Sequence, residues 1–197
     1  MPPHRLVVGA VLLCSLAPTV RAQQAVPVAA VIAAYQADSG VPTRGLAWDR
    51  GSSLPITWES ARPVAAEDWV RQQGLTLSRI GSIRVAISDT LARDAKIALH
   101  GNQQGIQQLD LTFESLDSWI TAPLEETLQA SLTLRPYKCA RETEGASFGN
   151  VAWVAKAPGR TASGLLMNWN CGHDGCGILL GLRYRRAELD AVECSGG

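Results

Sequence analysis

Two cysteines flank His173 and Asp174 in the segment Cys171-Gly-His-Asp-Gly-Cys176. Thiolate and imidazole groups bind zinc, so this segment is one candidate for a metal or thiol site. Structural zinc sites place paired cysteines about two to four residues apart and need a second ligand pair. Outside the N-terminal segment, the one other histidine is His100, and the C-x-x-C spacing of redox pairs is absent. We therefore expect neither a metal ion nor another cofactor here.

The cysteine count favours disulfides instead. Of the five cysteines, Cys14 lies in an N-terminal segment that we expect to be removed on export. The other four are Cys139, Cys171, Cys176 and Cys194. An even number of cysteines in an oxidising compartment implies two disulfides, which allow three pairings.

A hairpin selects among these pairings. Residues 163–171 and 176–184 each have the composition of a strand, and residues 172–175 form a loop between them with a glycine at each end. Cys171 and Cys176 then face each other, and facing Cα atoms lie about 4.5 to 5.5 Å apart, within disulfide range. We therefore favour Cys171–Cys176 and, by elimination, Cys139–Cys194.

Catalytic groups are few. The chain has no H-E-x-x-H zinc motif and no Gly-rich phosphate loop. His100 ends an alternating segment beside Gly101, so we expect it at a solvated strand end rather than in a catalytic role. By residue type, the candidates for a pair of glycosidase carboxylates are Glu59, Asp110, Glu114 and Asp174. With 18 acidic residues in the chain, we interpret all four as surface charge and assign no catalytic residue.

Tryptophan is abundant, with six copies, and exposed indole rings can stack on sugars while their N–H groups find polar partners. We expect Trp58 and Trp69 in the core. Trp48 follows Gly45 in a loop and is the best candidate for an exposed binding aromatic. Trp169, in the predicted hairpin, is a second candidate.

The tip of the hairpin is the other candidate binding feature. A loop that a disulfide holds in place loses less freedom on binding a partner. His173 and Asp174 at this tip are therefore candidate contact residues, although a stapled loop with no partner is the interpretation that the sequence favours.

The elements that position these groups follow from periodicity. Val28, Val31, Ile32 and Tyr35 form one apolar stripe of a helix within residues 27–38. Residues 65–73 and 122–130 are further short helices. Alternation of apolar and polar residues predicts strands at 75–79, 83–88, 96–100 and 109–113, and we expect further strands at 131–138 and 149–156. The predicted fold class is α+β, mainly antiparallel sheet, with two or three short helices and a disulfide-stapled C-terminal β-hairpin.

An internal similarity links two parts of the chain. Ile56-Thr-Trp-Glu-Ser60 and Leu111-Thr-Phe-Glu-Ser115 each precede a predicted helix and a Leu-Thr-Leu strand. A duplicated β-α-β unit would produce this pattern, and so would chance. The second copy, over fewer than 30 residues, resembles the small periplasmic β-α-β modules of secretins and of signalling outer-membrane receptors. This resemblance implies a structural part of an envelope secretion machine as one alternative function.

The N-terminus indicates the compartment. Residues 1–22 have a basic start, an apolar run of about 11 residues and a small-residue exit, which is the pattern of a cleaved secretory signal. We expect cleavage after Ala22, no remaining membrane span and a periplasmic or secreted location. Removing Arg5 and Arg21 leaves 16 basic residues against 18 acidic ones, a net charge of about −2. This balance argues against a nucleic-acid partner.

The expected organisation is a signal peptide (1–22), a short helix and linker (23–40) and one α+β domain (41–197), with 41–115 and 116–197 as alternative subdomains. We expect a non-enzymatic bacterial protein that binds an envelope protein or a peptidoglycan-type glycan, as an inhibitor, immunity or assembly factor. The alternative enzyme is a small cell-wall hydrolase with two catalytic carboxylates.

Overall fold

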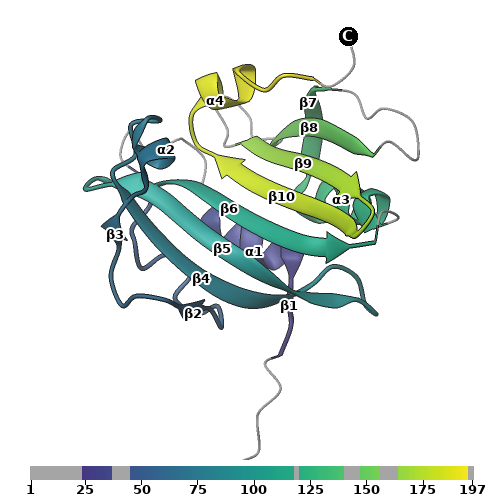
Figure 1. Ribbon diagram of the computed structural model, residues 1–197, viewed down its shortest axis with the longest axis horizontal. Helices are drawn as coiled ribbons and strands as arrows, with labels where there is room; N and C mark the ends of the chain where they lie inside the picture. The colour runs from purple at the N-terminus through teal and green to yellow at the C-terminus, as the bar shows by residue number, and fades with distance from the viewer. Residues whose placement is uncertain (1–23, 37–44, 118–119, 140–146, 156–163, 195–197) are drawn as a thin grey trace, which may run out of the picture.

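The computed structural model describes residues 24–36, 45–117, 120–139, 147–155 and 164–194, and shows one large sheet with helices against it (Figure 1). The expected signal peptide lies outside the described residues. The strands are β1 (Val26–Pro27), β2 (Thr57–Trp58), β3 (Val64–Ala65), β4 (Leu77–Ala86), β5 (Ala92–Asn102), β6 (Gly105–Leu116), β7 (Leu134–Lys138), β8 (Phe148–Ala155), β9 (Gly164–Gly172) and β10 (Gly175–Arg183). The helices are α1 (Val28–Tyr35), α2 (Asp68–Arg71), α3 (Thr121–Leu132) and α4 (Arg186–Asp190).

Two antiparallel meanders build the sheet. The strand order is β1-β4-β5-β6-β10-β9-β8-β7, and the short strands β2 and β3 pair with the outer edge of β4. The first meander, β4-β5-β6, joins the second, β7-β8-β9-β10, where β10 pairs with β6. Only β1, beside β4, is parallel to its neighbour among the described strands. The sheet is therefore mainly antiparallel, as the alternation predicted.

The hydrophobic core lies between one face of the sheet and the helices α1 and α3 (Figure 1). Val28, Val31, Ile32 and Tyr35 are all fully buried, which confirms the predicted apolar stripe. The hydroxyl of Tyr184 donates a hydrogen bond to the carbonyl oxygen of Tyr35 at 2.6 Å, next to the end of α1. The N-terminal helix is thus part of the main core.

Several predicted boundaries were wrong for identifiable reasons. The predicted strands 75–79 and 83–88 are one strand, β4, because Gly81 does not mark a turn. A Cβ at Gly81 would lie 2.6 Å from the carbonyl oxygen of Thr57, so the glycine permits the close approach of β2. The four-residue loop at 172–175 is instead a two-residue turn, since Gly172 pairs with Gly175. The described chain contains four helices rather than two or three, and α4 was not predicted.

The internal sequence similarity, which a duplicated β-α-β unit or chance would produce, does not correspond to a structural repeat. In the first copy, β2 pairs directly with β4. In the second copy, three strands separate β6 from β7 in the sheet. The two segments thus differ in topology, and the similarity is one of sequence alone.

Both disulfides lie in the C-terminal half. Cys171 and Cys176 are directly opposite in the β9–β10 ladder and are bonded to each other. Cys139 is bonded to Cys194, which ties the end of β7 to the segment after α4. The pairing is the one favoured by the hairpin register.

Candidate functional site

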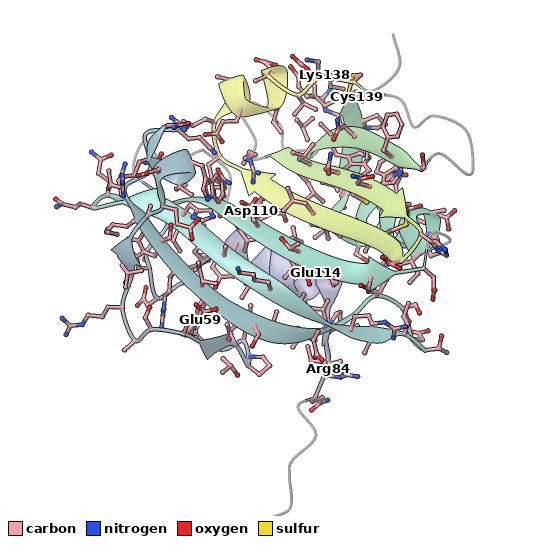
Figure 2. All side chains as sticks on the ribbon, in the orientation of Figure 1. Glu59, Arg84, Asp110, Glu114, Lys138 and Cys139 are labelled. Carbon is pink, nitrogen blue, oxygen red and sulfur yellow. A yellow bond between two sulfur atoms is a disulfide. The ribbon has the colours of Figure 1, made fainter. Side chains whose placement is uncertain are left out.

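A cavity of about 480 Å³ lies on the face of the sheet opposite α1 and α3. Its floor consists of the side chains that alternate with core residues along β4, β5, β6 and β10. One end is covered by residues 64–75, which include β3 and α2 and are called the α2 segment below. Figure 2 shows Asp110 and Glu114, both from β6, on this side of the sheet. Glu59 lies at the β2 edge, so the fold does not bring it together with these two acids.

His100 is at the covered end of the cavity. Its Nδ1 is 2.8 Å from the hydroxyl oxygen of Ser78, and its Nε2 is 3.6 Å from Oδ2 of Asp110. His100 is 3% exposed, so the expectation of a solvated strand end was wrong. Burial lowers the pKa of His100, as does the Arg183 charge, whereas Asp110 and Glu67 raise it. The net shift is downward, so the imidazole is neutral at pH 7 and the hydroxyl of Ser78 can donate to Nδ1.

Asp110 is the centre of a buried ion pair. Nη1 of Arg183 donates to its Oδ1 at 2.6 Å, and Nε2 of Gln108 donates to its Oδ2 at 2.6 Å. The side chains of Arg183 and Asp110 are 12% and 10% exposed. The prediction of surface charge was therefore wrong for Asp110, because Arg183, the last residue of β10, folds back over the sheet and neutralises it.

The set Ser78, His100 and Asp110 has the residue types of a catalytic triad but not its arrangement. In a triad the carboxylate accepts a hydrogen bond from the imidazole and stabilises the imidazolium that forms. Here both oxygens of Asp110 accept short hydrogen bonds from Arg183 and Gln108, and the imidazole nitrogen is beyond hydrogen-bond distance. Ser78 lies within a strand and is only 4% exposed. The cluster is therefore better suited to form the polar floor of a binding site than to activate a nucleophile.

Trp69, on α2, forms part of the cavity wall. It is 49% exposed, so its predicted place in the core was wrong. Its Nε1 donates to Oε2 of Glu67 at 2.7 Å, and its ring meets that of His100 edge to face, with centroids 5.5 Å apart. The helix has only one turn, and its one buried side chain is Val70, so the tryptophan faces outward. These contacts hold an exposed indole ring beside the polar floor.

The open part of the floor has polar and charged side chains. Lys96 and Thr112 are opposite each other in the β5–β6 ladder, and Glu114 lies two residues further along β6. All three line the cavity, and in the described part of the chain none has a side-chain hydrogen bond or ion pair. Ile80 and Leu179 add apolar surface. The cavity therefore offers both hydrogen-bonding groups and apolar contacts.

The predicted aromatic residues are located elsewhere. Trp169 is 2% exposed and lies in the core, so its ring is not available to a surface ligand. Trp48 is half-buried against the core, and its Nε1 donates to the carbonyl oxygen of Asn102 at 3.2 Å. The better candidate is Trp69. It was assigned to the core because the sequence of its helix suggests an apolar face packed against the protein, but no other described element covers its side chain.

His173 and Asp174 are exposed at the hairpin turn, as the hairpin interpretation expected. They border a second cavity of about 400 Å³, together with Ser115 and Asp117. This cavity is next to the Cys171–Cys176 disulfide and is distant in the fold from the α2 segment. Among the described residues, no group of three or more His, Cys, Asp or Glu side chains is arranged to hold a metal ion.

The sequence contains one match to a hydrolase nucleophile motif. Residues Gly145-Ala-Ser-Phe-Gly149 match G-x-S-x-G, whose serine in hydrolases occupies a sharp turn from a strand into a helix. Ser147 instead directly precedes the strand β8, and its carbonyl oxygen accepts a hydrogen bond from the amide of Cys171. The match therefore lacks the structural context of a nucleophile elbow.

Comparison with known proteins finds no matching family model, no matching curated protein and no matching solved structure. In the portion of the chain that the structure describes, no helix has the length and apolar character needed to cross a membrane.

Proposed function

We propose that this protein is exported and binds a cell-wall glycan in the cavity between the sheet and the α2 segment, without cleaving it. The observation that carries the proposal is Trp69, an exposed indole ring fixed beside a floor of hydrogen-bonding side chains. Sugars have apolar faces of C–H groups and a rim of hydroxyls, so they bind where an aromatic ring and polar groups converge. Two disulfides support an oxidising compartment, where such glycans occur.

The dimensions and charge of the cavity fit this proposal. Small-molecule sites have volumes of about 300 to 1,000 Å³ and combine apolar walls with a few polar groups. The cavity, at about 480 Å³, combines Val64, Trp69 and Leu179 with Lys96 and Glu114. Because it contains charges of both signs, it favours a ligand without a large net charge over a polyanion.

Co-sedimentation with insoluble peptidoglycan separates binding from hydrolysis. The protein is incubated with purified peptidoglycan, and the pellet and the soluble fraction are both analysed. Retention of protein in the pellet without soluble sugar fragments supports a binding protein. Release of fragments would favour the alternative hydrolase with two carboxylates, for which Asp110 and Glu114 are the acids that the cavity brings together. Protein that stays in the supernatant would contradict the proposal.

The hairpin turn supports a second candidate function, the binding of an envelope protein. His173 and Asp174 are exposed there, and the adjacent disulfide restricts the strands that carry them. A loop with little freedom binds a partner at a lower cost in conformational entropy. Crosslinking in an envelope fraction from position 172, where an added side chain would meet no atom within 4 Å, tests this function. A specific crosslinked partner, lost with a His173→Ala and Asp174→Ala double variant, is the expected result.

A further inference from the structure

Gln108 has a buried acceptor without a partner. The residue is 2% exposed and lines the cavity. Its Nε2 donates to Oδ2 of Asp110, which fixes the orientation of the side-chain amide. Its Oε1 has no hydrogen-bond partner among the described residues. Buried acceptors in native proteins are nearly always paired, so this atom indicates a missing donor.

Arg183 has unused donors next to it. Gln108 and Arg183 are opposite each other in the β6–β10 ladder, and both bind the carboxylate of Asp110. Every hydrogen bond of the Arg183 guanidinium to the described residues uses Nη1. Its Nε and Nη2 have no such partner in the described part of the chain. Guanidinium groups have five N–H donors. This end of the cavity therefore has unpaired N–H donors of Arg183 beside an unpaired acceptor, Oε1 of Gln108.

We infer that this end of the cavity binds a secondary amide, the acetamido group of an N-acetylated amino sugar. The carbonyl oxygen of the acetamido group would accept from the Arg183 guanidinium, and its N–H would donate to Oε1 of Gln108. Ile80, Val70 and Ala98 line the same cavity and give the acetyl methyl group an apolar contact, which a sugar hydroxyl would not use. The inference rests on the proposed glycan-binding function and specifies which sugars bind.

Access to Gln108 requires a small movement of the α2 segment. This segment contacts the sheet through the two-residue β3–β4 ladder and through the ring contact of Trp69 with His100, and the carbonyl oxygen of Gln73 accepts a hydrogen bond from Arg185, just before α4. Its buried side chains, Ala66, Val70 and Leu75, form a cluster separate from the main core. Few core contacts are therefore lost when the α2 segment moves. Segments of low local stability are typical of binding-site loops and lids.

The test compares two β-1,4-linked tetrasaccharides by calorimetry with the full-length mature protein. The tetramer of N-acetylglucosamine has an acetamido group where the tetramer of glucose has a hydroxyl. We expect the acetylated tetramer to bind at least about tenfold more tightly, because sites built around a hydrogen-bonded group discriminate against analogues that lack it. This comparison needs no variant and so does not depend on the folding of one.

Variants then locate the discrimination. Gln108→Leu should reduce the preference for the acetylated tetramer at least about tenfold, whereas Gln103→Leu, at an exposed position in the turn between β5 and β6, should leave it unchanged. Thermal unfolding checks that both variants are folded.

Equal affinities of the wild type for the two tetramers would overturn the amide inference and leave glycan binding intact. Binding of neither tetramer, nor of peptidoglycan, would overturn the proposed function as well. Preference for a sugar-free stem peptide would also overturn the assignment to an amino sugar.

Discussion

Gly181 gives the Arg183 guanidinium the space in which it reaches Asp110. Gly181 is opposite Asp110 in the β6–β10 ladder, and a Cβ at this position would lie 2.5 Å from Nη1 of Arg183. The arginine therefore folds back across a position without a side chain, two residues earlier in its own strand. The buried ion pair at the floor of the cavity depends on this glycine.

Gly181→Ala should therefore weaken the ion pair. The added methyl group displaces the guanidinium and leaves the carboxylate of Asp110 less well compensated, so we expect a loss of about 1 to 3 kcal/mol in unfolding free energy. Urea denaturation measures it. Gly177→Ala is the matched control in the same strand, because its Cβ would meet no atom closer than 4.0 Å. Equal stability losses in the two variants would contradict this role of Gly181.

The ion pair itself should show strong coupling between its partners. Arg183→Met leaves the carboxylate of Asp110 buried without its cation, and removal of one partner from a buried pair costs about 3 to 5 kcal/mol. In the double variant Arg183→Met with Asp110→Leu, no charge remains unpaired, so we expect it to be more stable than Arg183→Met alone. A double-mutant cycle from urea denaturation gives the coupling free energy. Additive losses would show that the two residues act independently.

Acidification should destabilise the protein through His100. Because burial lowers the pKa of His100, the unfolded chain takes up a proton at a higher pH than the folded one. The unfolding free energy should therefore fall as the pH drops below about 6.5, the ordinary histidine value, and should be fully retained above it. Denaturation between pH 5 and 8 measures this slope. His100→Gln should reduce it, whereas His173→Gln, at the exposed turn, should retain it; an unchanged slope in His100→Gln would refute the assignment.

The two disulfides should differ in their contribution. Cys139–Cys194 spans 55 residues and Cys171–Cys176 spans 5. Loop-closure entropy then gives stabilisations of about 4 and about 2 kcal/mol. Double alanine variants of each pair, compared by denaturation without reductant, test the difference. Peptide mapping of the unreduced protein checks the pairing, and a peptide in which Cys139 is crosslinked to Cys171 would contradict it.

The sequence predicted the features that depend on local periodicity. The stripe from Val28 to Tyr35 has a helical spacing, and the facing positions of Cys171 and Cys176 follow from one hairpin. The strand β4 was predicted as two separate strands, because a glycine such as Gly81 resembles a turn signal in a sequence. In the structure this glycine instead permits the close approach of β2.

The candidate site depends on contacts between distant segments, which periodicity does not encode. His100 and Asp110 come from neighbouring strands, and Arg183 reaches them from β10, more than 70 residues later in the chain. Nothing near His100 in the sequence distinguishes a buried histidine from an exposed one. Trp69 was misassigned because a one-turn helix beside Val70 gives too few residues to show which face is covered.

Calorimetric titration of the wild-type protein and of Trp69→Ala with a soluble peptidoglycan fragment tests glycan binding in the cavity most directly. Trp58→Ala is the matched control, because Trp58 is outside the cavity and stacks with the Arg79 guanidinium, 4.3 Å from its ring centroid. We expect saturable binding that Trp69→Ala weakens at least about tenfold, by analogy with nucleic-acid sites, where the stacking of a base on an aromatic ring contributes about 1 to 3 kcal/mol. Trp58→Ala should leave the affinity unchanged. Absence of binding by the wild-type protein, or equal affinities for wild type and Trp69→Ala, would contradict glycan binding in the cavity.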